Sequence, residues 1–346
     1  MRYLKVYFLA LTVFTLASCT SNDDTTKLGN WLTRADYSGD ARRDAVSFVI
    51  GDTAYVGTGY GGPVPVKKLN SFYKYDPAKD AWTSIASLVD PANPTTNDLS
   101  RQGASAFTVG TRGYVTSGFD NNFEMRKDTW EYNPATNSWA PKADFPGAAR
   151  YYAVGFGLGE YGYIGTGSSG SGGSNYSDFF KFSPGAEGTP GTWSEINPLK
   201  DKRQQAVAFV IKDTAYVVTG TSNSEATTRF YAYDSKNDQW LERFQIKNAT
   251  DGSFDDDYTT LARYGAVAFV INNKAYLTTG TLSNTWEFDP MTSLWTEKTQ
   301  FDAASRTGAV GFSVKNRGFV GLGLASSVTL DDLHEFDPAA ENDTND

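Results

Sequence analysis

Residues 263–280 read RYGAVAFVINNKAYLTTG, and this stretch decides the fold. Its run from Ala266 to Ile271 is apolar at every position, which is typical of a strand buried on both faces. A turn signal follows at residues 272–274, and a second apolar run ends at Gly280. The stretch therefore predicts a buried β-hairpin that begins three residues after Arg263.

The same pattern, an arginine, two further residues, an alanine and an apolar run, recurs along the chain at spacings of 43 to 60 residues. After each hairpin comes a loop of variable length and an aromatic strand with a turn, such as FDPMTSLW at 288–295. Each copy thus supplies four strands, and their regular recurrence indicates a repeat architecture. The arginines that begin the six copies are Arg42, Arg101, Arg150, Arg203, Arg263 and Arg306.

The order of these strands resembles that of kelch repeats. The resemblance implies an all-β fold, a six-bladed kelch β-propeller in which each four-stranded sheet is one blade. Kelch strands usually end in Gly-Gly, whereas here the pair is mostly Thr-Gly, with the second glycine kept.

The sixth copy lacks its tryptophan, and a matching residue stands at the other end of the chain. Trp31 lies 11 residues before Arg42, which is the spacing between Trp139 and Arg150. We therefore expect the N-terminal segment to supply the outer strand of the last blade, which would close the ring and remove the open sheet edges.

The N-terminus carries a segment that is separate from the fold. Basic residues at 2 and 5, an apolar run at 6–16 and the sequence LASC ending at Cys19 resemble a bacterial lipoprotein signal. The resemblance implies cleavage before Cys19 and lipidation of its sulfur, with an ordinary secretory signal as the alternative. The expected division is a signal peptide at 1–18, a tether at 19–29, the propeller at 30–338 and a polar tail at 339–346.

This division predicts a protein of the bacterial outer membrane, held by lipid. The sequence SNDD at 21–24 resembles a surface-export signal, which would place the protein on the outside of the cell, with a solvated linker as the alternative. The formal net charge of the whole chain is −9 and falls to −11 without the signal peptide. Such an acidic chain is not expected to bind nucleic acid, or to bind membranes other than through its lipid anchor.

The composition also bears on redox and metal chemistry. Cys19 is the only cysteine, so no internal disulfide can form, and His334 is the only histidine. Copper redox sites of the kind found in some kelch propellers need several histidines and a cysteine-linked tyrosine. We therefore expect no cofactor and no metal site.

The connectivity of the blades predicts which face is functional. Loops between second and third strands and links between blades lie on one face, and their lengths vary. The two long links, 83–100 and 241–262, follow the first and fourth copies and should wall the channel mouth. The six motif arginines begin the innermost strands at this face, where they form either an anion-binding funnel or structural pairs. Aromatic residues near this face are predicted either to stack on sugar rings or to pack the loops: Tyr60, Phe119, Tyr258 and Tyr264.

Two functions from different classes remain open. The first is a non-catalytic binding module for a glycan, a peptide or a protein partner on the long-loop face. The second follows from a resemblance to the kelch-type N-acetylneuraminate epimerases, which implies a sugar mutarotase with a carboxylate for proton transfer. Glu124 and Glu225, both in loops between second and third strands, are the candidates for that carboxylate.

Overall fold

The computed structural model describes residues 27–95, 97–170, 173–243, 258 and 260–343. The predicted signal peptide, the lipidation site Cys19 and most of the tether lie outside these residues. All named elements in the described ranges are strands, so the prediction of an all-β architecture is confirmed. None of the described segments is a helix that is long and apolar enough to cross a bilayer.

The hairpin that decides the fold forms as its sequence predicts. β25 (Ala266–Ile271) pairs with β26 (Lys274–Thr279), and Phe269 lies opposite Tyr276. Asn272 and Asn273 both have positive φ values, 51° and 60°, as a tight two-residue hairpin turn requires. β27 (Thr285–Asp289) and β28 (Leu294–Lys298) complete a four-stranded antiparallel sheet.

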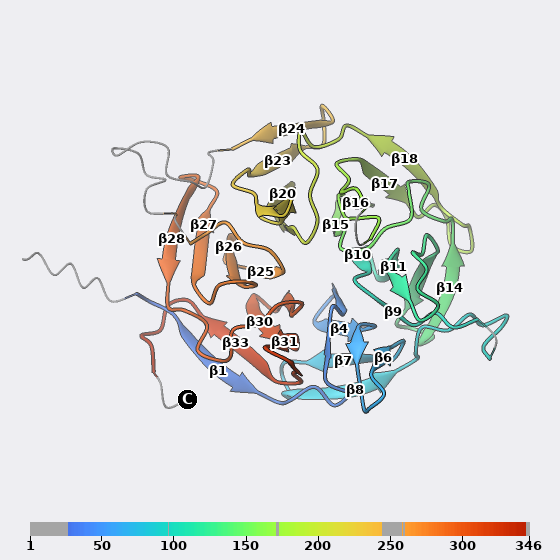
Figure 1. The fold of residues 1–346 in the computed structure, drawn as a ribbon, viewed down its shortest axis with the longest axis horizontal. Helices are drawn as coiled ribbons and strands as arrows, with labels where there is room; N and C mark the ends of the chain where they lie inside the picture. Colours follow the sequence, from blue (N-terminus) through green and yellow to red (C-terminus); the bar gives the residue numbers. More distant parts are fainter. Residues whose placement is uncertain (1–26, 96, 171–172, 244–257, 259, 344–346) are drawn as a thin grey trace, which may run out of the picture.

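The other copies of the motif build sheets with the same order. Within the described residues there are six sheets of four strands. Figure 1 shows them around a common centre, with the first strand of each hairpin innermost. Besides the sheet of β25 to β28, they contain β3 (Val46–Ile50), β4 (Thr53–Gly57), β7 (Phe72–Asp76) and β8 (Ala81–Ile85); β10 (Ser105–Val109), β11 (Arg112–Thr116), β13 (Thr129–Asn133) and β14 (Ser138–Lys142); β15 (Val154–Leu158), β16 (Tyr161–Gly165), β17 (Phe179–Ser183) and β18 (Thr192–Ile196); β19 (Val207–Ile211), β20 (Thr214–Val218), β23 (Tyr231–Asp234) and β24 (Gln239–Glu242); and β29 (Val310–Val314), β30 (Arg317–Gly321), β33 (Leu333–Asp337) and β1 (Asn30–Arg34).

The last of these sheets joins the two ends of the chain. β1 pairs antiparallel with β33, and Trp31 lies opposite Phe336. The Trp31 side chain is fully buried, and its ring centroid lies 4.8 Å from that of Phe301 and 4.6 Å from that of Phe336. The N-terminal segment therefore forms the outer strand of the sheet that contains the C-terminal strands.

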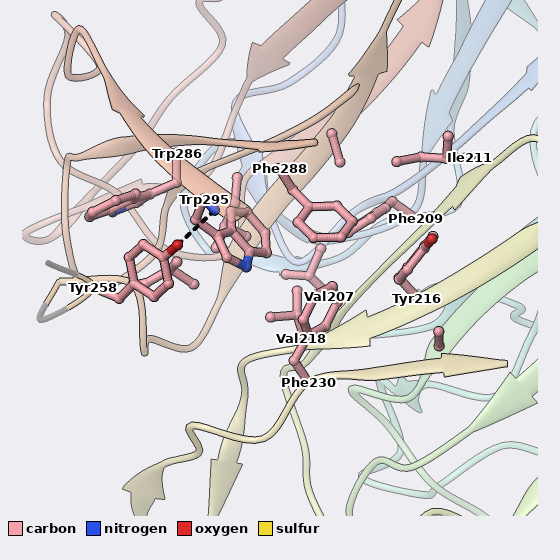
Figure 2. Close-up of a cluster of buried hydrophobic side chains, with 14 residues drawn as sticks. Val207, Phe209, Ile211, Tyr216, Val218, Phe230, Tyr258, Trp286, Phe288 and Trp295 are labelled. Atoms are coloured by element: carbon pink, nitrogen blue, oxygen red, sulfur yellow. Dashed lines mark hydrogen bonds between the residues drawn. The ribbon is translucent and has the colours of Figure 1, made fainter. Parts of the chain in front are cut away.

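Aromatic side chains fill the spaces between neighbouring sheets. In the cluster between the sheets of β19 to β24 and β25 to β28, Phe209 stacks on Tyr216 at 5.2 Å, and Tyr216 meets Phe288 edge to face at 5.3 Å (Figure 2). A stacked aromatic pair recurs on the first two strands of each of the six sheets; it is Phe–Tyr in five of them and Phe312–Phe319 in the sheet of β29 and β30. This packing ties each sheet to the next and keeps the central strands rigid.

Short strands extend the hairpins beyond the sheets at the long-loop face. They are β2 (Arg42–Arg43), β5 (Tyr60–Gly61), β6 (Lys67–Lys68), β9 (Arg101–Gln102), β12 (Phe119–Asp120), β21 (Thr221–Ser222), β22 (Glu225–Ala226), β31 (Leu324–Ala325) and β32 (Val328–Thr329). The glycine after each second strand donates its amide to the carbonyl of the motif arginine in another copy, at 2.7–2.9 Å: Gly59 to Arg101, Gly118 to Arg150, Gly167 to Arg203, Gly220 to Arg263, Gly280 to Arg306 and Gly323 to Arg42.

Candidate functional site

The six motif arginines are buried beneath the long-loop face. None has more than 2% of its surface exposed. In every copy Nη1 donates to the carbonyl oxygen of the residue 16 positions later, and Nε donates to an acceptor two positions earlier. For Arg150 these acceptors are the carbonyls of Thr166 and Ala148, both at 2.9 Å.

The residue 16 positions after each arginine adopts the left-handed conformation. Its φ lies between 58° and 63° in all six copies: Thr58, Ser117, Thr166, Thr219, Thr279 and Leu322. This conformation is unfavourable for a residue with a Cβ, and most of all for a β-branched one. Because the arginine holds the carbonyl of this residue, it fixes the strained turn that leads into the loop. The Thr-Gly pair noted in the sequence is this turn.

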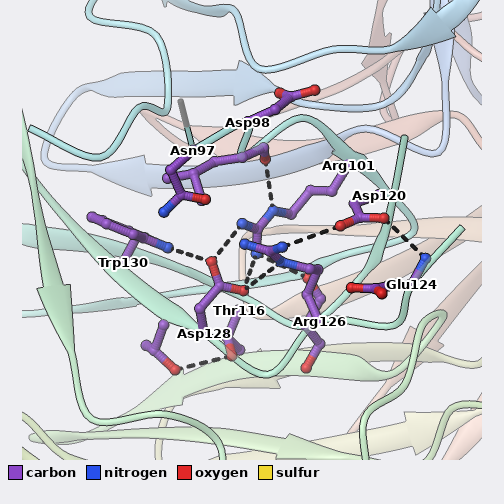
Figure 3. Close-up of polar contacts among 12 residues, drawn as sticks. Asn97, Asp98, Arg101, Thr116, Asp120, Glu124, Arg126, Asp128 and Trp130 are labelled. Carbon is purple, nitrogen blue, oxygen red and sulfur yellow. Dashed lines mark hydrogen bonds and ion pairs between the residues drawn. The ribbon is translucent and has the colours of Figure 1, made fainter. Parts of the chain in front are cut away.

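Four of the arginines also pair with carboxylates, and Arg203 does so with Asp201, two residues before it. Arg101 donates to Asp128 from Nη1 at 2.9 Å and from Nη2 at 2.7 Å (Figure 3), and Arg150 and Arg306 hold Asp178 and Asp332 in the same way. Burial alone would raise the pKa of the Asp128 carboxyl, but the Arg101 guanidinium and the Trp130 indole outweigh it and hold this pKa well below its usual range. The arginines therefore hydrogen-bond the backbone beneath the loop face and are not exposed on its surface.

The surface of the channel mouth is formed by the residues that follow the arginines. The second residue after each arginine has φ between 52° and 64°, and these residues together line a cavity of about 160 Å³: Asp44, Gly103, Tyr152, Gln205, Gly265 and Gly308. Five of their amides donate to the carbonyl of the equivalent residue in a neighbouring copy, at 2.8–3.3 Å. Three of the six are not glycine, and strained positions of this kind cluster at functional sites.

Two of these residues meet across the mouth. The Tyr152 hydroxyl donates to Asp44 Oδ2 at 3.0 Å, and Arg43 donates to the same oxygen at 2.6 Å. The Tyr152 ring can reach Asp44 because Gly103 lies between them, where a Cβ would come within 3.0 Å of that ring. Burial raises the pKa of the Asp44 carboxyl, although Arg43 and Tyr152 oppose the shift. Burial and the nearby Asp44 carboxylate also raise the pKa of Tyr152.

A second group of side chains adjoins this pair. β2, β5 and β6 form a three-stranded sheet in which Arg43, Tyr60 and Lys68 are cross-strand neighbours. The Arg43 guanidinium lies 5.1 Å from the Tyr60 ring centre. The Lys68 ammonium lies 4.6 Å from the Phe119 ring and 4.4 Å from the Phe123 ring.

The contacts continue back to the mouth. The Phe119 ring lies 6.1 Å from that of Tyr151, and the Tyr151 and Tyr152 rings are 4.2 Å apart. Because the Tyr152 hydroxyl and Arg43 both donate to Asp44, these ring contacts connect back to Arg43. We call this group the aromatic–basic cluster, and its members are Arg43, Asp44, Tyr60, Lys68, Phe119, Phe123, Tyr151 and Tyr152.

The predicted site residues occupy several different environments. Tyr60 and Phe119 are half-buried members of the aromatic–basic cluster. Tyr258 lies in the hydrophobic core, where its ring meets Trp286 at 5.8 Å and its hydroxyl accepts a hydrogen bond from the Trp295 amide at 3.0 Å (Figure 2). Packing, the alternative that the sequence left open, thus describes the position of Tyr258. Tyr264 is half-buried and is the counterpart of Arg43 and Tyr151 in its copy.

The two carboxylate candidates are exposed, and neither forms an ion pair with a described residue. The Glu124 side chain is exposed, and its amide donates to Asp120 at 2.9 Å (Figure 3). Glu225 is exposed in β22. Of the two long links, 83–100 is described except for residue 96, while residues 244–257 and 259 of the link 241–262 lie outside the described residues.

Sequence reasoning missed Arg43, Asp44, Lys68, Tyr151 and Tyr152. It selected the arginines because they are constant in all copies of the repeat. Constancy in every copy indicates a role in the fold that the copies share, and not a ligand site formed by some of them. The two positions after each arginine differ between copies, as in Arg-Asp, Gln-Gly and Tyr-Tyr. That variation within an otherwise constant motif was the signal that could have located this surface.

The comparisons with known proteins agree on the repeat. No protein-family model matches the chain. It is 23% identical over 221 residues to Kelch-like protein 25 of Xenopus tropicalis, a match that covers 64% of this chain and 34% of that protein. It is 31% identical over 72 residues to Kelch-like protein 21 of Danio rerio, which covers 21% of this chain and 10% of that protein. The chain thus spans a third or less of the length of these relatives.

A solved structure extends the likeness to nearly the whole chain. The structure of YjhT superposes with a TM-score of 0.65 and 16% sequence identity, and the match covers 87% of this chain and 96% of that one. At this identity the likeness concerns the fold. Together with the internal repeat and the four-stranded sheets, it identifies the chain as a kelch-repeat β-propeller.

Proposed function

We propose that the six sheets are the blades of one closed propeller, which β1 completes. In support, the innermost strands contact one another in order from β3 through β10, β15, β19 and β25 to β29, and β29 contacts β3. The hydrogen bond from Gly323 to Arg42, at 2.9 Å, links the last copy to the first in the same way as the others are linked. A closed ring leaves only short, protected sheet edges and gives the loop face a rigid base.

We propose that this loop face is the surface of a non-catalytic binding module. The observation that carries the proposal is the aromatic–basic cluster, which gathers residues from three copies of the repeat at the channel mouth. Concave sites with aromatic walls and a few charged groups are the usual binding sites on rigid scaffolds. The Kelch-like relatives favour a protein or peptide partner, and the exposed rings also suit a glycan.

The setting of this module follows from the signal at the N-terminus. We propose that the chain is exported, lipidated at Cys19 and held at the bacterial outer membrane, with the propeller facing away from the lipid. The acidic composition of the chain supports attachment through acyl chains alone.

The test compares two tyrosines that each lie against a cation. A soluble protein of residues 27–346 is screened on peptide and glycan arrays as the parent, as Tyr60→Ala and as Tyr161→Ala. Tyr161 is 37% exposed and has the Lys181 ammonium 4.8 Å from its ring, but it begins β16 at the opposite face. We expect array hits to be lost in Tyr60→Ala and kept in Tyr161→Ala. Equal retention in both would place the site elsewhere.

One observation favours the mutarotase alternative. The Asp44 carboxyl, buried beside the Tyr152 hydroxyl at the channel mouth, has the raised pKa that proton transfer to a sugar would use. Glu124 and Glu225 have no comparable environment, since both are exposed. Proton NMR of freshly dissolved N-acetylneuraminate tests this alternative. Faster anomer exchange with the parent than with Asp44→Asn would support catalysis, and equal rates would exclude it.

A further inference from the structure

Lys68 is a buried cation without an anionic partner. Its side chain is only 6% exposed. Within the part of the chain that the structure describes, its ammonium makes no hydrogen bond and no ion pair, and its neighbours are aromatic rings. The Asp120 carboxylate, whose charge acts on Lys68, is occupied by Arg126 at 3.1 Å and by two backbone amides. The Lys68 nitrogen is not among the fully enclosed side-chain atoms of the described residues, so its ammonium protons face outward past the rings and not toward a protein oxygen.

The rings around Lys68 hold the ammonium in place and leave one side open. Phe119 and Phe123 lie 4.6 and 4.4 Å from the nitrogen, and Tyr60 lies at 6.0 Å, so cation–π attraction fixes the head group. Phe123 is 77% exposed and has a φ of 65°, a strained position for a large exposed side chain. A ligand that reached Lys68 would therefore touch the outer face of Phe123.

From this geometry we propose that Lys68 is the anchor for a carboxylate of the ligand, and that the carboxylate belongs to an acidic sugar residue. The ammonium protons supply charge-assisted hydrogen bonds to the carboxylate, and Arg43, two strands away, adds a second positive charge. The flat faces of Phe123 and Tyr60 pack against the sugar ring. The proposal rests on the binding function of the aromatic–basic cluster and names its ligand class.

The backbone around Lys68 favours a sugar over an extended peptide. A peptide that binds by adding a strand needs free amides and carbonyls on a sheet edge. The Lys68 amide donates to Asn121 Oδ1 at 3.0 Å, and the Lys68 carbonyl accepts from Asn121 Nδ2 at 3.3 Å, while β5 covers the other edge. Both edges of β6 are thus occupied at this residue, and the recognition elements left are side chains.

The experiment uses a matched pair of probes and a matched pair of variants. Methyl β-D-glucuronide and its uncharged methyl ester are titrated by calorimetry into the soluble protein of residues 27–346. Lys68→Met keeps the length of the side chain and removes its charge. Lys67→Met is the control, because Lys67 is the preceding residue in β6 and is exposed. Melting temperatures of both variants establish that they are folded.

We expect the parent to bind the acid at least tenfold more tightly than the ester, because hydrogen bonds to charged groups carry discrimination of this order. Lys68→Met should remove the preference, and Lys67→Met should keep it. If Lys68→Met does not fold, Phe123→Ala takes its place, and weaker binding of both probes is expected from the lost ring contact.

Three results would overturn the proposal. The first is a preference for the acid that persists in Lys68→Met. The second is Lys68-dependent binding of acetyl-Glu-Glu-amide without binding of the glucuronide, which would assign the carboxylate to a peptide. The third is no binding of the glucuronide by the parent while Tyr60-dependent array hits remain, which would leave the binding module in place and remove its acidic sugar ligand.

Discussion

Each motif arginine donates hydrogen bonds that hold the backbone where the second strand of its copy leads into the loop. Its guanidinium donates to the carbonyl of the left-handed residue 16 positions later, and in four copies it also pairs with an aspartate. Such groups are costly to remove one at a time, because the remaining partner stays buried without a counterpart. The arginines should therefore control stability.

Arg150→Ala is expected to lower the free energy of unfolding by about 3 kcal/mol, because it leaves the Thr166 carbonyl and the Asp178 carboxylate unpaired. Urea unfolding followed by tryptophan fluorescence measures the change. Lys79→Ala is the control, since Lys79 forms an exposed pair with Asp76 and should change stability by less than about 0.5 kcal/mol. Equal effects of the two substitutions would contradict the structural role of Arg150.

Asp128 and Asp44 should make the free energy of unfolding depend on pH in opposite directions. The folded-state pKa of Asp128 is depressed, so its contribution is present above its unfolded pKa of about 4 and is lost as the pH falls through the folded value. The folded-state pKa of Asp44 is raised, so its contribution is present below about pH 4 and is lost as the pH rises through the folded value.

Unfolding free energies of the parent, Asp128→Asn and Asp44→Asn between about pH 2 and about pH 7 separate these cases. The deficit of Asp128→Asn relative to the parent should stay constant above about pH 5 and shrink as the pH falls below about 4. Asp44→Asn should gain stability relative to the parent as the pH rises. Parallel curves for all three proteins would show that neither carboxyl changes its pKa on folding.

The identity of the site residues was only partly predictable from the sequence. Tyr60 and Phe119 could be placed because they follow the second strands at a fixed position. Lys68 could not, because it lies in a loop whose length differs between copies, and only the pairing of β6 with β5 brings it beside Phe119. Tyr152 and Asp44 are far apart in sequence, and their hydrogen bond depends on the missing side chain of Gly103.

Neighbouring sheets pack closely where a glycine of one sheet lies against a phenylalanine ring of the next. A Cβ on Gly162 of β16 would come within 2.0 Å of the Phe107 ring on β10, and Gly113 and Gly318 meet the rings of Phe48 and Phe269 in the same way. The second strand of each of these sheets has glycine at this position, and the absence of a side chain lets the neighbouring ring lie against its backbone. The apolar runs predicted these strands, but the pairing of one glycine with one ring required the register.

β1 is the strand whose role can be tested most directly. Deletion of residues 28–40 removes Trp31 from its contacts with Phe301 and Phe336 and leaves the outer edge of β33 unpaired. We expect aggregation and a loss of at least about 3 kcal/mol, the usual cost of removing a buried tryptophan side chain. Thermal melting and light scattering measure both effects. The control is a chain that begins at Leu28, which should melt like the parent; equal stability of the deletion would contradict the closure of the ring by β1.

The propeller fold itself was predictable because it repeats. A single copy of the motif is a weak signal, but six copies with the same order of strands leave few alternatives. The ligand could not be predicted from the repeat, because the residues that recur in every copy build the scaffold. Information about the ligand lies in the loops, where the copies differ.

In the proposed export of this chain, attachment to the membrane would depend on the sulfur of Cys19. Cys19→Ala should move the protein from the detergent phase to the aqueous phase in phase separation of whole cells, because the acyl chains supply the membrane affinity. Metabolic labelling with a fatty acid should lose its signal at the same time. Ser18→Ala, at the preceding residue, should keep both properties. Unchanged partition of Cys19→Ala would refute the lipid anchor.

The pairing of β1 with β33 fixes when the protein can finish folding. The first strand of the chain has no partner until the last strand has been synthesised, so the contact of highest sequence separation forms last. The sheets of β3 to β28 can form without β33, because each takes its four strands from one continuous stretch of the chain. A chain cut short before residue 333 would therefore keep these sheets and leave Trp31 without its contact with Phe336. Such a chain should be open to proteolysis at β1, so resistance to a protease would report that the chain has been made through β33.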